Sequence, residues 1–301
     1  MRLSLWPNPE RPIGEVLELA EWGEQCGWDG IYLADHFMPN DPSGKVMGGP
    51  SLDCLAALGA VAARVTRMRV GSLVLGNLYR HPAVVAHWAA TMGTIAEGGF
   101  VLGVGAGWQV NEHVAFGLEL GTIRDRLNRF EEAVVVIRSM LNEERTTFVG
   151  DHYQIRDAPC EPQPNHRIPL LIGGKGEQRT MRIAARLADE WNAWCTPEEL
   201  AHKSAVLNRH CSDLGRDPAD ICRSTQALLW PAEYAEGRTV PESLALRPRL
   251  EGSWAAIAGQ VQAYAAAGTD ELIVPDWLFT SVEAARHYLG EFLTVAAEAR
   301  A

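Results

Sequence analysis

Residues 100 to 108 read Phe100-Val101-Leu102-Gly103-Val104-Gly105-Ala106-Gly107-Trp108. The apolar start predicts a buried β-strand, which runs directly into alternating glycines and an aromatic residue. Because glycine has no Cβ, a flat or charged ligand can approach this backbone closely. The pattern has two interpretations: the glycine fingerprint of a dinucleotide-binding fold, or one strand end of a (β/α)₈ barrel.

The composition is that of an ordinary globular protein. The chain has 301 residues, 47% hydrophobic and 22% charged, with a formal net charge of −11. Because the balance is acidic and no basic run occurs, we expect no nucleic-acid partner. The N-terminal apolar run is too short for a signal peptide, and no apolar stretch of about 18 residues predicts a membrane span.

The cysteines indicate the compartment. They are scattered without a C-x-x-C pair, at Cys26, Cys54, Cys160, Cys195, Cys211 and Cys222. This distribution is typical of reduced thiols in the cytosol, so we expect a cytoplasmic protein. Since His, Asp and Glu nowhere fall at zinc-ligand spacing, we expect no metal site.

Strands and helices alternate along nearly the whole chain. The pattern predicts strands at 2–6, 30–34, 68–75, 100–106, 170–172, 190–194, 221–228 and 271–274, and helices at 13–26, 52–64, 82–96, 124–141, 177–187, 197–214, 253–267 and 282–297. A small hairpin is expected over 146–155, with insertions near 39–50, 108–168 and 231–253. Eight strand–helix units without a linker favour one TIM barrel over residues 1–301, with function at the C-terminal strand ends.

The dinucleotide alternative fails on spacing. That fingerprint needs a helix directly after the glycines and an acidic residue about 20 positions further on, at the end of a second strand. Here Gly107 is followed by a stretch that Gly117 and Gly121 interrupt, and no strand is predicted near position 125. The sequence therefore favours the barrel.

Chemically useful residues follow the predicted strands. His36 can donate or accept a proton, and the adjacent Asp35 would fix its tautomer; the alternative is a loop histidine without a role. Gly76 and Asn77 after the third strand suggest a bulge beside a ligand, or a plain turn.

The fifth predicted strand ends in Ile172-Gly173-Gly174-Lys175-Gly176-Glu177-Gln178-Arg179-Thr180 and opens a helix. Glycines at a helix N-terminus present free backbone N–H groups, and the helix dipole favours an anion there. Lys175 and Arg179 add positive charge, and Thr180 adds a hydroxyl. We therefore predict a phosphate cradle, with a ligand-free glycine turn as the alternative.

Together these motifs resemble the luciferase-like monooxygenase superfamily, and most of all its branch that uses the deazaflavin coenzyme F420. The residues concerned are Asp35-His36-Phe37, Gly76-Asn77 before Tyr79-Arg80-His81-Pro82, Gly103–Trp108 with Asn111-Glu112, and Ile172-Gly173-Gly174. The likeness runs over most of the chain and is weakest after about residue 230. The resemblance implies a TIM barrel with insertions, a deazaflavin ring in its mouth, and a bulge around Leu75-Gly76-Asn77, often with a non-proline cis peptide.

The resemblance also implies roles for individual residues. The cofactor-binding residues would be Asp35, Leu75, Gly76, Asn77, Gly105, Ala106, Gly107, Trp108, Asn111, Gly173, Gly174, Lys175, Gly176, Arg179 and Thr180. Some deazaflavin dehydrogenases of this family have an acidic Glu where this chain has Trp108. Proton transfer would then fall to His36 or Glu112, the predicted catalytic residues, or to solvent.

We therefore expect hydride transfer between coenzyme F420 and a small organic substrate, in an enzyme that is a homodimer like many family members. Two alternatives stay open: an FMN-dependent monooxygenase on the same fold, and a non-catalytic flavin- or deazaflavin-binding protein. The residues Trp6, Trp108, Trp191, Trp194, Trp230 and Trp277 suggest an aromatic-lined pocket, although a tryptophan-rich core explains them equally well. Residues 39–50 and 231–253 are candidates for lids over the substrate.

Overall fold

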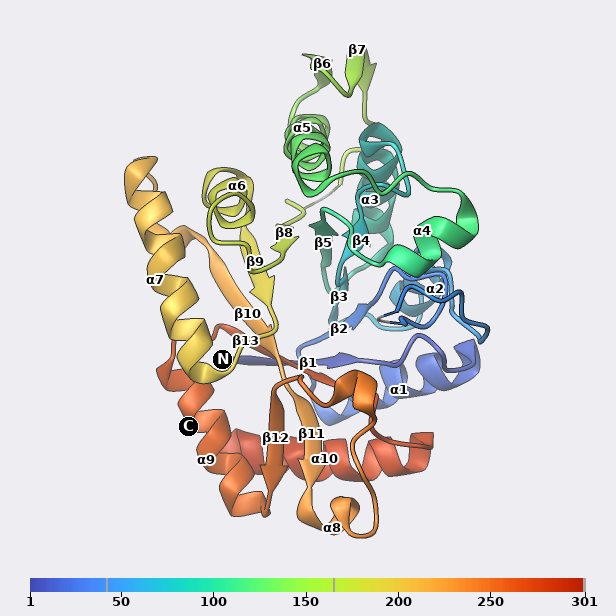
Figure 1. Ribbon diagram of the computed structural model, residues 1–301, viewed down its shortest axis with the longest axis vertical. Helices are drawn as coiled ribbons and strands as arrows, with labels where there is room; N and C mark the ends of the chain where they lie inside the picture. The colour runs from blue at the N-terminus through green and yellow to red at the C-terminus, as the bar shows by residue number, and fades with distance from the viewer. Residues whose placement is uncertain (42, 165, 300–301) are drawn as a thin grey trace.

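Eight parallel strands close into a barrel in the computed structural model, which describes residues 1–41, 43–164 and 166–299 (Figure 1). The strands are β1 (Arg2–Trp6), β2 (Gly30–Leu33), β3 (Arg69–Ser72), β5 (Phe100–Gly105), β8 (Leu170–Gly173), β9 (Glu190–Ala193), β10 (Cys222–Gln226) and β13 (Glu271–Pro275). They pair in this order, and β13 pairs with β1, which closes the ring. The predicted TIM barrel is confirmed.

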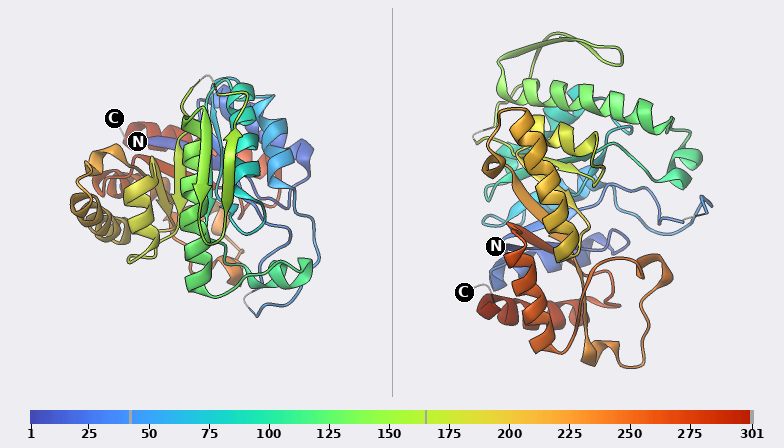
Figure 2. Two further views of the ribbon diagram at one scale, coloured as in Figure 1. Left: turned by 90° about the horizontal axis from the view of Figure 1, so that it is seen from above. Right: turned by 60° about the vertical axis from the view of Figure 1, so that its left-hand side comes forward.

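Helices surround the barrel on its outside (Figures 1 and 2). They are α1 (Ile13–Cys26), α2 (Cys54–Ala62), α3 (Pro82–Ile95), α4 (Val110–Phe116), α5 (Ile123–Asn142), α6 (Thr180–Leu187), α7 (Pro197–Asp213), α9 (Trp254–Ala266) and α10 (Val282–Ala299). The first helix ends at Cys26 as predicted, and Gly27 caps it with a φ of 91°, in the left-handed region that glycine favours. None of the described helices combines the length and apolar character needed to cross a bilayer. All six cysteines are free thiols.

The third strand differs from its prediction. Instead of one strand over 68–75, the chain forms β3 and a short β4 (Leu75–Gly76), which pairs with the end of β5. Between them lies a cis peptide bond that joins Leu73 to Val74. The non-proline cis peptide expected around residues 75–77 therefore exists, but it lies before Leu75 rather than at or after it.

The glycines of β5 make room for this bulge. A Cβ placed on Gly103 would lie 2.0 Å from the carbonyl oxygen of Ser72, and one on Gly105 would lie 2.8 Å from Cγ2 of Val74. A Cβ on Gly173 of the next strand would lie 2.9 Å from Cγ1 of the same valine. The Val74 side chain thus fills the space that the sequence pattern left for a ligand.

Two insertions have their own secondary structure. The predicted hairpin is confirmed as β6 (Arg145–Val149) paired with β7 (Gln154–Pro159), and it projects beyond α5 (Figure 1). The predicted strand over 221–228 ends at Gln226, and a new strand β11 (Leu228–Pro231) follows. It pairs in parallel with β12 (Arg249–Gly252), so the predicted insertion over 231–253 contains one of two paired strands and the connection over 232–248 that joins them. The short helix α8 (Ala232–Ala235; Figure 1) and a 3₁₀ turn at Glu242–Leu244 lie in this connection.

Ion pairs close the N-terminal end of the barrel. Arg69 on β3 contacts Glu190 on β9 at 2.5 Å and Glu271 on β13 at 3.1 Å. Arg2 on β1 contacts the same Glu271 at 3.2 Å. Because these side chains come from four different strands, the charged network links the barrel across its interior.

We predict that Gly103→Ala destabilises the protein by about 1–3 kcal/mol, because the new methyl group has to displace the Ser72 backbone. Urea unfolding followed by circular dichroism measures this. As a control, Gly59→Ala in α2 meets nothing within 4 Å, so its stability should equal or exceed that of the wild type. Equal stability of the two variants would contradict the packing argument.

Candidate active site

The mouth at the C-terminal ends of the strands brings together residues that are far apart in sequence. His36 and Phe37 follow β2, Tyr79 follows β4, and Glu112 lies in the first turn of α4 after β5. Glu112 is fully buried and accepts hydrogen bonds from all three: from Nδ1 of His36 at 2.9 Å, from the backbone N–H of Phe37 at 2.9 Å, and from the Tyr79 hydroxyl.

The hydrogen bonds define the charge of this cluster. Burial opposes ionisation of Glu112, but the bonds from His36, Tyr79 and the Phe37 N–H outweigh it and lower the pKa of the carboxyl. Burial and the adjacent carboxylate raise the pKa of Tyr79, so its phenol stays protonated and donates a hydrogen bond to Glu112. The carboxylate therefore holds Nδ1 of His36 as the protonated nitrogen.

The His36 ring faces an exposed tryptophan. The centroids of the His36 and Trp108 rings lie 5.6 Å apart in an edge-to-face arrangement, and Trp108 is 51% exposed. Nε2 of His36 makes no hydrogen bond with any described residue. The arrangement leaves this nitrogen available to exchange a proton with a molecule in the mouth.

Asp35 has a different role from the predicted one. Its carboxylate accepts two hydrogen bonds from Arg80, at 2.7 and 3.0 Å, and a third from the backbone N–H of Gly76 at 2.9 Å. The hypothesis that Asp35 fixes the tautomer of His36 is therefore wrong, because Glu112 occupies that position. Asp35 instead ties the end of β2 to β4.

Several predicted cofactor residues support the mouth from behind. Leu75, Asn77 and Asn111 are buried, with exposed fractions of 1%, 8% and 0%. The side-chain amide of Asn111 donates to the carbonyl oxygens of Pro39 and Lys45, at 3.0 and 3.1 Å, and so ties these two residues to α4. Gly76, Ala106 and Gly107 are partly exposed beside the mouth.

The glycine turn after β8 is preorganised by its neighbours. Gly174 has a φ of 135°, its N–H donates to the Asn192 carbonyl at 2.9 Å, and its carbonyl accepts from the Trp191 indole at 2.8 Å. Lys175 is exposed and has no ion-pair partner among the described residues. Arg179 turns towards α5, where it contacts Glu131 at 3.3 Å. The helix predicted to begin at residue 177 is α6, and it begins at Thr180 instead.

Sequence reasoning gave no role to Tyr79, which lies in the mouth, or to Arg247, which lies in the 231–253 insertion. Tyr79 lies in a quoted motif, but only the fold shows that its hydroxyl reaches Glu112. Arg247 lies in the 231–253 insertion, and its guanidinium lies 4.8 Å from the ring centroid of Trp194. No local sequence signal marks either contact.

The six predicted pocket tryptophans divide into groups. Trp6, Trp194 and Trp277 follow or end three different strands and form one cluster, with ring centroids 4.5 to 5.8 Å apart. Trp191 is a buried core residue, and Trp230 packs against Tyr234. Of the six, Trp194 lines a cavity, Trp191 is a core residue, and Trp108 is exposed beside His36, so neither explanation describes the whole set.

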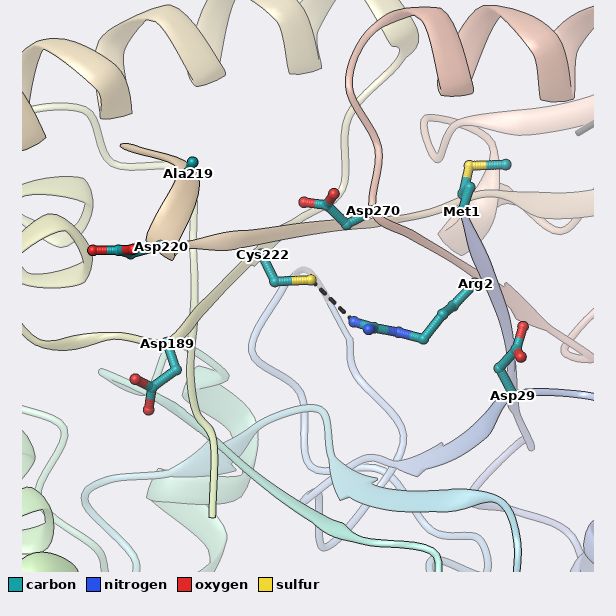
Figure 3. A pocket seen from close by; sticks show the side chains of 8 residues that line it. All are labelled: Met1, Arg2, Asp29, Asp189, Ala219, Asp220, Cys222 and Asp270. Atoms are coloured by element: carbon teal, nitrogen blue, oxygen red, sulfur yellow. Dashed lines mark hydrogen bonds between the residues drawn. The ribbon is translucent and has the colours of Figure 1, made fainter. Parts of the chain in front are cut away.

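A cavity of about 490 Å³ lies at the opposite, N-terminal end of the barrel (Figure 3). Its acidic lining comprises Asp29, Asp189, Asp220 and Asp270, and Arg2 contacts the Cys222 sulfur there at 3.0 Å. Among the described residues, no three His, Cys, Asp or Glu side chains lie close enough together to hold a metal ion. In this fold the N-terminal face serves stability, so the candidate site is the other end.

The fold and the site define a family. The model of the luciferase-like monooxygenase family matches residues 1–238, and the chain belongs to this family. It is 36% identical over 213 residues to an F420-dependent glucose-6-phosphate dehydrogenase of Microbacterium testaceum, and 37% identical over 176 residues to one of Nakamurella multipartita. The matches cover 69% and 58% of this chain but 61% and 50% of those relatives, so the chain spans less than two thirds of their length.

Solved structures confirm the fold. An F420-dependent secondary alcohol dehydrogenase in complex with an F420-acetone adduct matches with a TM-score of 0.84, 17% identity and 98% coverage of both chains. The monooxygenase RslO1 from Streptomyces bottropensis matches with a TM-score of 0.80, 19% identity and complete coverage of both chains. At these identities the likeness concerns the barrel and not the reaction.

We predict that Glu112→Gln lowers stability at pH 7 by about 1–3 kcal/mol, because three donors lose a charged acceptor. A lowered native pKa stabilises the fold above the ordinary value of 4.5, and this contribution disappears as the pH falls through the native pKa. The wild-type and variant stabilities should therefore converge in acid. Urea unfolding between pH 7 and 3 measures this, with the exposed Glu97→Gln as control; a constant difference would contradict the assignment.

Proposed function

We propose that the chain is a coenzyme F420-dependent oxidoreductase that transfers a hydride between the deazaflavin and a small organic substrate. The observation that carries the proposal is the His36–Glu112 pair at the mouth of a barrel of this family. The names of the Microbacterium and Nakamurella relatives, F420-dependent dehydrogenases, favour this cofactor over FMN.

The residues present fit such a cofactor. The turn at Gly173–Gly176 would be the anion site, because the exposed Lys175 has no ion-pair partner among the described residues and the N-terminus of α6 follows at Thr180. Gly76, Ala106 and Gly107, next to His36 and Trp108, would border the ring. Asp35, Leu75, Asn77, Asn111 and Gly105 would hold this surface in place, and Gly176 and Thr180 would complete the turn. Arg179 would contribute indirectly, because its contact with Glu131 on α5 holds the start of α6 in place.

When bound, coenzyme F420 accepts or donates a hydride, and the protein supplies orientation and proton handling. His36 would exchange the substrate proton at Nε2, because Nδ1 is committed to Glu112. Glu112 is buried behind the His36 imidazole, so it stabilises the protonated form of that imidazole and does not itself contact the substrate. Trp108 and the 39–50 loop would exclude water from the mouth.

The proposed partners and location rest on the family resemblance and on the composition. We propose a small-molecule substrate, a homodimer and a cytoplasmic location, with neither a nucleic acid nor a membrane as partner. The free thiols support the cytoplasmic location, and the acidic composition supports the expectation of no nucleic-acid partner. Size-exclusion chromatography with light scattering measures the oligomeric state.

We predict that oxidised F420 binds the protein with a micromolar or lower Kd and that FMN binds at least about tenfold more weakly. Quenching of F420 fluorescence and of flavin fluorescence measures the two constants. Tight FMN binding without F420 affinity would favour an FMN-dependent monooxygenase. F420 binding without turnover on a panel of small alcohols and carbonyl compounds would favour a binding protein.

In the same assays, His36→Ala should lower kcat by about 10²–10⁴-fold and leave F420 binding nearly unchanged. The control is His87→Ala, which removes an exposed imidazole on α3. If both variants keep wild-type turnover, His36 does not transfer the proton.

A further inference from the structure

The 231–253 insertion builds a second compartment beside the mouth. A cavity of about 350 Å³ lies between this insertion and the residues that follow β8 and β9; Lys175, Trp194, Thr196, Arg247, Arg249 and Glu251 are among its lining residues. Arg247 stacks over the ring of Trp194 at 4.8 Å. A guanidinium that stacks by its face still has its edge N–H groups free to donate.

The charges of this cavity do not cancel. Glu251 is paired with Arg249 at 2.7 Å, and Glu199 caps α7 by accepting the Thr196 N–H at 3.0 Å. Arg247 is half-buried, and no described acidic side chain pairs with it. Burial lowers the pKa of its guanidinium, and no neighbouring carboxylate counteracts this effect. A half-buried cation without a counter-ion indicates a place for an anion.

The wall behind Arg247 is aromatic. Trp194 contacts both Trp6 and Trp277, with centroids 5.8 Å away in each case. The indole N–H groups of Trp6 and Trp277 are buried and meet no acceptor among the described residues. Trp194 itself lines the cavity and offers apolar area beside the unpaired guanidinium, while Trp6 and Trp277 pack against it from outside the lining.

We propose that this compartment binds the carboxylate of a flat, apolar substrate, with Arg247 as the residue that selects it. The inference rests on the proposed function and names the substrate class of that site. A carboxylate matches the fork of a guanidinium with two oxygens, and the Trp194 indole in the cavity lining provides apolar area for an unsaturated or aromatic body.

The experiment measures binding of trans-cinnamate and of its neutral isostere cinnamamide to the full chain loaded with oxidised F420. Calorimetry needs no turnover, and tryptophan fluorescence gives a second readout. In the wild type, cinnamate should bind about tenfold or more tightly than cinnamamide. Arg247→Met should abolish this preference and leave cinnamamide binding nearly unchanged.

Arg238→Met is the matched control. Arg238 lies in the same insertion and stacks on Tyr234 at 4.4 Å, but it does not line the cavity. This variant loses the same charge from a comparable cation–π pair, so it should keep the wild-type preference. A loss of preference in both variants would overturn the assignment to Arg247, because the effect would then be one of net charge.

Three other outcomes would also overturn the proposal. The first is equal binding of cinnamate and cinnamamide by the wild type, and the second is tighter binding of glucose 6-phosphate than of cinnamate. The third is that Arg247→Met weakens F420 but not a tail-less deazaflavin, with cinnamate unaffected, because the anion would then belong to the cofactor. The F420 titration by itself tests the proposed function, so failure there is distinguishable from failure here.

Discussion

The Glu112 carboxylate, on helix α4 after β5, accepts hydrogen bonds from two other segments: from His36 and Phe37 after β2, and from Tyr79 in the loop after β4. A buried carboxylate is costly unless several donors surround it, so these segments cannot separate without exposing an unpaired charge. The orientation of His36 and the position of Tyr79 both depend on this requirement. The shape of the mouth is thus maintained by one electrostatic constraint.

Local patterns were sufficient for the architecture. Apolar periodicity predicted all eight barrel strands, because each is a short buried run bounded by turns, and glycine and proline marked several helix ends. Failures occurred where tertiary contacts decide. The break between β3 and β4 depends on how Val74 packs against another strand, and the β11–β12 pairing joins segments separated by an insertion. No window of neighbouring residues contains that information.

The candidate site was predicted less completely. His36, Glu112 and the Gly173–Gly176 turn lie at strand ends, where the barrel topology predicts function. Asp35 was given the wrong partner because Arg80, 45 positions away, competes for it across the bulge. Arg247 was missed because what distinguishes it is the lack of an ion-pair partner among the described acidic side chains. Such an imbalance can be recognised only after the surrounding side chains have been placed.

The packing of Val74 against glycines on two strands also makes those positions interdependent. A larger residue at position 105 or 173 requires a smaller residue at position 74, because a side chain at either glycine would occupy the space that the Val74 side chain fills. Substitutions at these positions should therefore be tolerated in combination where they fail alone. In mutational terms, the glycine-rich strand and the bulge behave as one epistatic unit, and a relative with a larger residue on the strand should have a smaller one on the bulge.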